Sequence, residues 1–204
     1  MGLVKYNNNS ISAVSSVASM PSGALVPIKT LTASSSATLS FVHGSNGVVL
    51  DSTYPIYKFS FINIHPSGDN TDFQVNFRDG GSSYDATKTS TVFEAYHTEG
   101  DEAALGYKHS SDLAQSTAAQ KITSNIGNDN DQSGCGELWL FAPSSTTFVK
   151  HFLVRTVHYG GDYQEQYYAA GYCNVTAAID AVQFSMSSGN IDSGKIKLYG
   201  IKDS

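Results

Sequence analysis

The residues best suited to contact a ligand are tyrosines clustered in one short stretch. Tyr159, Tyr163, Tyr167 and Tyr168 lie among Gly, Asp, Gln and Glu. A tyrosine offers a rigid apolar ring and a hydroxyl that can hydrogen-bond to sugars or protein groups. The stretch therefore predicts a polar, aromatic loop that contacts a sugar or a partner protein. The alternative is that Tyr167 and Tyr168 begin a strand while the other residues bridge a subunit interface, because most tyrosines pack.

A second candidate has the oxygen spacing of a calcium loop. Asp129, Asp131 and Ser133 supply oxygen side chains at the first, third and fifth positions, and Gly134 is the sixth residue. Calcium prefers such oxygen ligands, but the loop normally closes with a bidentate carboxylate at the twelfth position. That position is Leu140. Calcium thus stays an alternative to a solvated loop, and we expect no obligatory cofactor.

Other catalytic or metal-binding patterns are incomplete. The stretch from Gly189 to Lys195 has phosphate-loop spacing, but Ile196 stands where a Ser or Thr would bind magnesium, and a strand-like pattern follows. The six histidines lack the spacing of a zinc site. The sequence also contains no nucleophile elbow and no metalloprotease motif. We therefore expect a protein that is not an enzyme.

Composition limits the class of protein. A chain of 204 residues suits one all-β domain, and the low charged content of 15% leaves room for Ser, Thr, Gly and Asn. The net charge of -6 argues against binding nucleic acid. Cys135 and Cys173 have no paired spacing and are expected to be reduced structural thiols. Because no secretory signal or membrane span is visible, we expect a soluble protein made in a cytoplasm.

The elements that must position these residues are strands. Apolar and polar residues alternate at 56–64, 73–78 and 195–201, which predicts strands there. Further strands are expected at 91–96, 137–142, 148–157, 168–175 and 181–186, for some eight to ten strands in all. The turn Asp79-Gly80-Gly81 predicts a hairpin between 73–78 and 91–96. Helix formers after Ser111 predict one short helix over 111–122. The expected fold is all-β, a β-sandwich of jelly-roll type with one short helix.

The N-terminal region differs in composition from the rest. The stretch from Ser10 to Ser40 is rich in Ser, Ala and Thr, and residues 1–36 are expected to be an extended arm or part of a pair of edge strands, with 25–31 and 38–42 as the ordered parts of the stretch. The alternative is an unordered terminus. Residues 37–204 are expected to be a single sandwich domain. Trp139, Phe141, Phe59 and Phe184 are its expected core residues. An arm together with exposed Tyr and Phe residues predicts a homo-oligomer, preferably a trimer.

Five stretches spread over nearly the whole chain have a shared character: MGLVKYNNNSISAV, YPIYKFSFINIHP, DFQVNFRDGG, SSTTFVKHF and AGYCNVTAAIDAVQFSMSSGNIDSGKIKLYGI. They resemble structural proteins of tailed bacteriophages, especially phages of marine bacteria and cyanobacteria. The resemblance implies a virion protein on the particle exterior, a capsid decoration or head-fibre protein, with partners such as the major capsid protein. It carries over no catalytic residue. The alternative function is a carbohydrate-binding tail-fibre or adhesin module that contacts host surface glycan. A glycan hydrolase is the third and weakest hypothesis.

Overall fold

The computed structural model describes residues 24–203, and that part of the chain is built from twelve strands without a helix. The strands are β1 (Leu25–Thr32), β2 (Thr38–Val42), β3 (Ile56–Pro66), β4 (Phe73–Arg78), β5 (Lys88–Thr98), β6 (Ala103–Tyr107), β7 (Gln120–Lys121), β8 (Gly134–Phe141), β9 (Lys150–Tyr159), β10 (Tyr163–Cys173), β11 (Ala181–Met186) and β12 (Ile191–Ile201). The all-β expectation is confirmed. Across these residues there is consequently no helix that could span a membrane.

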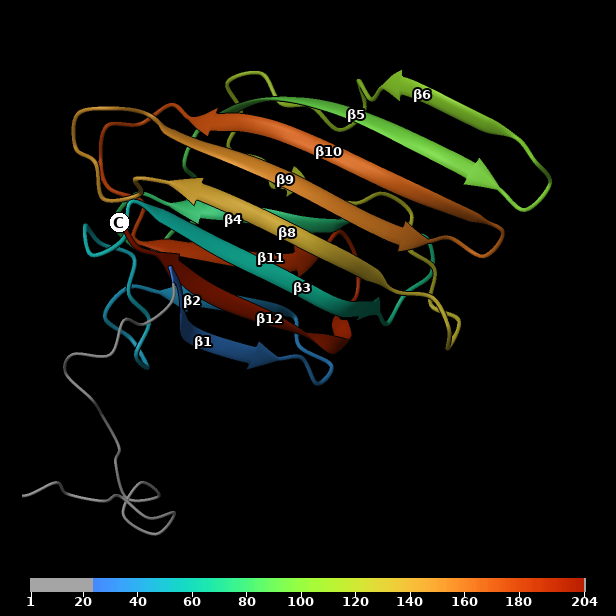
Figure 1. The fold of residues 1–204 in the computed structure, drawn as a ribbon, viewed down its shortest axis with the longest axis horizontal. Coiled ribbons are helices and arrows are strands. Elements are labelled where there is room, and N and C mark those ends of the chain that lie inside the picture. The colour runs from blue at the N-terminus through green and yellow to red at the C-terminus, as the bar shows by residue number, and fades with distance from the viewer. Residues whose placement is uncertain (1–23, 204) are drawn as a thin grey trace, which may run out of the picture.

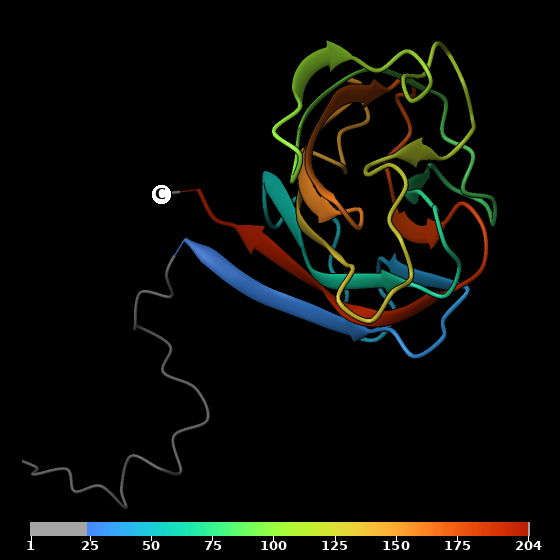
Figure 2. The ribbon, with the colours of Figure 1, turned by 90° about the vertical axis from the view of Figure 1, so that its right-hand side faces the viewer.

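The strands form two antiparallel sheets of unequal width. The larger has eight strands in the order β1-β12-β3-β8-β9-β10-β5-β6, and the smaller has four in the order β2-β11-β4-β7. Figure 1 shows the larger sheet in front of the smaller one, and Figure 2 shows it curving around the smaller sheet. This arrangement is a β-sandwich in which the wider sheet has one face on the core and another face that no strand of residues 24–203 covers.

The core lies between the sheets and is rich in aromatic rings. Alternate residues of β3, β4, β8 and β11 are buried, as period-two patterns require. Phe59 and Phe184 are fully buried, as expected from the sequence. Trp139 and Phe141 are only half-buried, so that part of the expectation is wrong. The inward residues of β8 are Leu138 and Leu140, which turns Trp139 to the outer face of the larger sheet.

The helix predicted over 111–122 is absent, because the backbone of this segment bonds to β5 instead of to itself. Lys88 and Ser116 exchange both backbone hydrogen bonds, with N···O distances of 2.8 and 2.9 Å. Ser90 N–H donates to the Leu113 carbonyl at 2.9 Å. The segment ends in β7, which pairs with β4. Long-range pairing thus overrides the modest helix propensity of this short stretch.

The hairpin predicted at Asp79-Gly80-Gly81 is also wrong. After β4 the chain leaves the smaller sheet and enters the larger one, where β5 lies between β10 and β6. Both hydrogen-bonding edges of β5 are therefore occupied, and none is left for β4. Gly80 and Gly81 have φ values of 110° and 69°, so the glycines turn the chain as expected, although toward the other sheet.

The N-terminal region gives part of its expected structure. Stretches 25–31 and 38–42 fall in β1 and β2, which are edge strands of the larger and the smaller sheet. The part of the predicted arm that precedes residue 24 lies outside the described residues. β1 pairs with β12 so that Leu25 lies opposite Ile201, which brings the two ends of the described chain to the same edge.

Candidate functional site

The outer face of the larger sheet carries large apolar side chains in contact with solvent. Leu153 on β9 is 49% exposed, Phe93 on β5 is 44% exposed, and Leu105 on β6 is 72% exposed. Val157 and Tyr107 add to the same face. Single exposed apolar residues are common on proteins, whereas a contiguous group marks a surface that binds something. We call this surface, over β8, β9, β10, β5 and β6, the outer face.

Cross-strand pairing explains why these residues gather. Trp139, Leu153 and Ala170 lie opposite one another on β8, β9 and β10. In the next row Arg155 lies opposite Tyr168, which in turn lies opposite Phe93. Directly opposed residues on one sheet face touch. An alternating sequence in each strand thus becomes a continuous stripe across the sheet.

The apolar half of a groove lies along this stripe. It has a volume of about 340 Å³, and its lining includes Trp139, Leu153, Tyr168 and Phe93. The rings of Phe93 and Tyr168 stack with centroids 4.7 Å apart and planes 13° from parallel. The stacked pair, which we call the aromatic platform, presents apolar ring surface to solvent that can pack against the face of a sugar ring or an apolar side chain.

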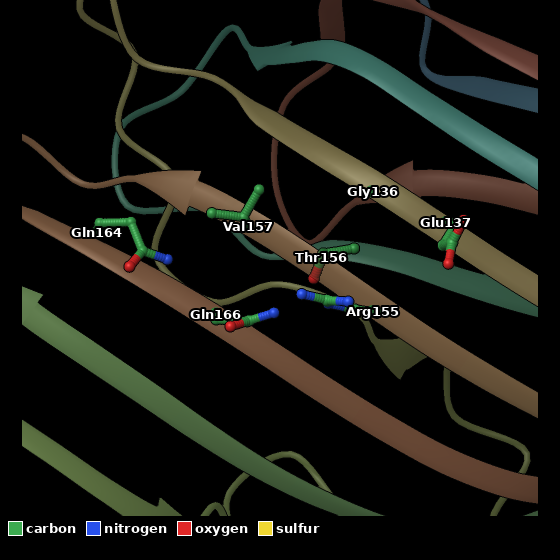
Figure 3. A pocket seen from close by; sticks show the side chains of 7 residues that line it. All are labelled: Gly136, Glu137, Arg155, Thr156, Val157, Gln164 and Gln166. Atoms are coloured by element: carbon green, nitrogen blue, oxygen red, sulfur yellow. The ribbon is translucent and has the colours of Figure 1, made fainter.

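The polar half of the groove adjoins the apolar half. It has a volume of about 540 Å³ and is lined by Gly136, Glu137, Arg155, Thr156, Val157, Gln164 and Gln166 (Figure 3). Both halves share Glu137 and Arg155. With its amide oriented toward the guanidinium, Gln166 accepts from Arg155 Nε at 2.7 Å and from Nη2 at 2.8 Å. Figure 3 shows these two side chains together over β9 and β10.

Charges in the groove are held in fixed positions. Lys58 Nζ is 2.5 Å from Glu137 Oε2 and lies 4.8 Å from the centre of the Trp139 ring. Burial alone would raise the pKa of Glu137, but the hydrogen bond from Lys58 and the charges of Lys58 and Arg155 lower it. Glu137 therefore stays an ionised acceptor, and Arg155 supplies donors beside it. Together they can bind hydroxyl and amide groups of a ligand next to the aromatic platform.

The four tyrosines predicted to share a site lie on different surfaces. The stretch is a hairpin between β9 and β10, turning at 160–162. Tyr168 points to the outer face, whereas Tyr167 is fully buried and Tyr163 points inward against His158. Tyr159 lies at the turn, where its hydroxyl donates to the Gly161 carbonyl at 2.5 Å. Only Tyr168 therefore lines the groove.

A second, smaller cavity lies on the inner face, where β5, β6 and β10 extend the larger sheet. It has a volume of about 200 Å³ and is lined by Glu94, Tyr96, Thr98, Lys108, Tyr163 and Glu165. Lys108 Nζ is 2.5 Å from Glu94 Oε2, and Ser124 Oγ donates to Glu165 at 2.8 Å. Burial, and then the neighbouring Glu94, raise the pKa of Glu165 to about 7.

The two carboxyl groups of this cavity influence each other's titration. After burial, the neighbouring Glu94 carboxylate helps to raise the pKa of Glu165, which favours one proton on the pair.

The raised pKa of Glu165 gives a testable pH dependence. Because the native pKa is about 7 and the ordinary value is 4.5, the native state holds the proton more tightly. The resulting stability is present below pH 4.5 and lost as the pH rises through 7. As the pH rises from 4.5 to 7, the unsubstituted protein loses this stability and Glu165→Gln does not. We therefore expect the free energy of unfolding of Glu165→Gln to rise by about 3 kcal/mol relative to that of the unsubstituted protein over this range. Urea denaturation of both proteins at the two pH values measures this.

The pH experiment must separate Glu165 from the other groups that titrate in this range. His158 is buried and has a pKa lowered to about 4, mainly by burial, so it destabilises the protein as the pH falls from 6.5 toward 4. That contribution is present in both proteins and cancels in the difference. Glu137→Gln is the matched control, because the pKa of Glu137 is lowered and its contribution has the opposite sign. A pH-independent difference for Glu165→Gln would contradict the interpretation.

The predicted calcium ligands lie in a surface turn. Asp129 and Asp131 are exposed, and the Gln132 N–H closes the turn on the Asp129 carbonyl at 2.9 Å. Asp131 and Ser133 line a polar hollow that also includes Asp192, whereas Asp129 does not. Over residues 24–203, no three His, Cys, Asp or Glu side chains are grouped closely enough to hold a metal ion.

The two cysteines and the stretch with phosphate-loop spacing lie in structural elements outside the groove. Cys135 and Cys173 are both free thiols, and burial raises the pKa of Cys173 to about 12. The phosphate-loop spacing falls in the turn before β12 and in β12 itself, as the strand-like pattern after Lys195 indicates. There Gly194 has a φ of 118°, and a Cβ at this position would meet the Asn63 carbonyl oxygen at 2.5 Å.

Sequence reasoning missed most of the groove. Trp139 was assigned to the core, and Phe93, Leu153 and Arg155 were not singled out. Alternation in 150–159 shows that Leu153, Arg155 and Val157 share one face opposite Phe152 and Val154. That pattern was visible, but both faces contain apolar residues, so the sequence alone did not tell which one is uncovered. No protein-family model matches the sequence, and a search of curated proteins finds no match either.

Proposed function

We propose that this chain is a non-enzymatic structural protein of a virion exterior that works by binding through its outer face. The observation that carries the binding role is the contiguous apolar stripe of Trp139, Leu153, Tyr168 and Phe93 on a sheet face that none of the described strands covers. Interface cores favour such aromatic residues, and Arg155 beside them is the most enriched charged type. The particle context rests on the resemblance to tailed-phage structural proteins, within which a capsid decoration or head-fibre role fits best.

A jelly-roll topology is part of this proposal. In a jelly roll of eight strands, the first, eighth, third and sixth form one sheet and the second, seventh, fourth and fifth form the other. Setting aside β5, β6, β9 and β10, the sheets here read β1-β12-β3-β8 and β2-β11-β4-β7. This order supports a jelly roll with two added strand pairs that widen one sheet. Virus capsid and lectin domains often use this fold.

The test of the virion role is the copy number and position of the protein in purified particles. Quantitative mass spectrometry should find it at shell-like stoichiometry, and antibodies against the folded protein should label intact particles. A few copies per particle would place it in the tail instead. Its absence from purified particles would overturn the virion proposal and leave the binding surface to be explained in another setting.

Glycan binding in the groove is the second candidate function. It is favoured by the aromatic platform of Phe93 and Tyr168 lying directly beside the polar pair Glu137 and Arg155. Sugars present both apolar ring faces and hydroxyl groups, so they need both kinds of surface. On this reading the protein would be an adhesin module that recognises host surface polysaccharide.

Substitution in the groove tests the glycan candidate. We expect Tyr168→Ala to weaken binding to host surface polysaccharide about tenfold or more, since it removes half of the ring platform. Calorimetry with purified polysaccharide measures the change. Lys195→Ala, on an exposed position of β12 away from the groove, is the matched control. If Tyr168→Ala binds as tightly as the control, the groove is not the glycan site.

A further inference from the structure

The edge strand β6 lacks the usual protection against pairing with another chain. Within residues 24–203 it is the last strand on its side of the larger sheet, and all five of its residues, Ala-Ala-Leu-Gly-Tyr, are exposed. Edge strands of soluble proteins generally carry a proline, a bulge or a charged residue that discourages added strands. β6 contains no proline and no charge, and Leu105 at its centre is 72% exposed.

The backbone of β6 shows which residues can bond to a further strand. Thr98 N–H donates to the Glu102 carbonyl at 2.8 Å, and Lys108 N–H donates to the Val92 carbonyl at 2.9 Å. Glu102 and Lys108 thus point their backbone groups toward β5. In an antiparallel pair this direction alternates along the strand. Ala103, Leu105 and Tyr107 must therefore direct their N–H and C=O groups to the open edge.

A second β6 strand matches this pattern when it runs antiparallel with Leu105 opposite its own copy. Ala103 then lies opposite Tyr107 of the second copy. Each outward-facing residue exchanges an N–H and a C=O bond with its counterpart, as narrow antiparallel pairs do. The pairing is self-complementary, which is the requirement for a twofold interface.

The flanking charges select the same register. Moving outward from Leu105 by equal steps, Glu102 lies opposite Lys108 of the second copy, and Asp101 lies opposite His109. Lys108 already contacts Glu94 of its own chain. In the pair it would lie between two carboxylates. A shift of two residues in either direction keeps the backbone bonds but loses the Glu102–Lys108 match.

We propose that two copies of this protein dimerise by pairing their β6 strands, which joins the two larger sheets into one continuous sheet. Addition of a strand to an exposed edge is a common mode of protein recognition. Because the two edges are identical, the contact closes with two copies and replaces the trimer expected from the sequence. The apolar outer faces then become continuous across the twofold axis at Leu105.

The experiment is sedimentation equilibrium of the full chain with variants on β6. We expect a dimer at about 100 µM protein. Leu105→Pro removes the outward N–H without breaking a bond to β5, and Leu105→Lys places two like charges at the axis. Both variants should be monomers with an unchanged β-type circular dichroism spectrum. Leu153→Lys, the same change at another exposed leucine of the outer face, should stay dimeric.

Charge reversal tests the register. E102K and K108E should each weaken the dimer about tenfold or more, whereas an equimolar mixture of the two should regain wild-type affinity, because each Lys then faces a Glu. A wild-type protein that is monomeric or trimeric at this concentration would overturn the proposal. So would a Leu105→Pro variant that dimerises with unchanged affinity. K108E also breaks the Lys108–Glu94 pair of its own chain, so its circular dichroism spectrum and thermal unfolding are compared with those of the wild type. Failure of the mixture to recover when both variants fold as the wild type does would exclude the register centred on Leu105.

Discussion

Replacing Phe184 with alanine is expected to lower the free energy of unfolding by about 3 to 5 kcal/mol. Phe184 on β11 is fully buried between the sheets. Its ring centroid lies 5.2 Å from that of Phe61, 5.4 Å from Phe59 and 5.7 Å from Phe73. Removing the ring leaves a cavity that rigid strands on both sides cannot close. Urea denaturation monitored by circular dichroism measures the loss.

Trp139→Ala is the matched comparison for this prediction. It removes a larger side chain, but Trp139 is half-buried on the outer face, where solvent can replace the lost contacts. We expect Trp139→Ala to lower the free energy of unfolding by about 1 kcal/mol, near the centre of the range for point substitutions. Equal losses for the two variants would mean that the outer face is covered by protein and that the sheets pack differently.

Gly136→Ala is expected to lower the free energy of unfolding by roughly 3 kcal/mol or more and to weaken the binding of any ligand in the groove. Gly136 has a φ of 154°, and a Cβ there would lie 2.4 Å from the Arg155 carbonyl oxygen and 2.7 Å from Thr156 Cα. Those atoms belong to the backbone of β9, so the two strands must separate. Thermal unfolding and ligand titration report the two effects.

Gly134→Ala, two residues earlier on β8, provides the control. A Cβ at Gly134 would meet first the Cδ1 atom of Ile126, at 3.1 Å. That atom is the end of a side chain and can move by a few tenths of an ångström. We expect Gly134→Ala to lower the free energy of unfolding by less than about 1 kcal/mol. A Gly136→Ala variant as stable as Gly134→Ala would mean that β8 and β9 are not tightly paired at this point.

Strand positions were predictable where alternation was regular. Expected stretches 56–64, 73–78 and 181–186 fall in β3, β4 and β11 because a strand with one face on the core must alternate. β6 was missed because Ala-Ala-Leu-Gly-Tyr has no alternation when every residue is exposed. The partner of β5 was mispredicted because a turn sequence fixes where the chain bends and not which distant strand it reaches.

The candidate site was less predictable than the fold. Period-two patterns assign residues to two faces, but in β8 both faces carry large apolar groups, and only the position of the smaller sheet decides which is buried. The tyrosines were recognised by type, yet Tyr167 and Tyr168, as neighbours on β10, must point to opposite faces. A contact surface made by adjacent strands depends on pairing that no local pattern contains.

The pairing of β1 with β12 has a consequence for how fast the chain can fold. β8, β9 and β10 follow one another as antiparallel neighbours, so their contacts need only short loops to close. β12, by contrast, lies between β1 and β3, which come from the opposite end of the described chain. Contacts between distant segments slow the folding of β proteins, because loop-closure entropy is lost before the contact forms. The β8-β9-β10 ribbon should therefore acquire protection from hydrogen exchange early, and β1 and β12 should acquire it last.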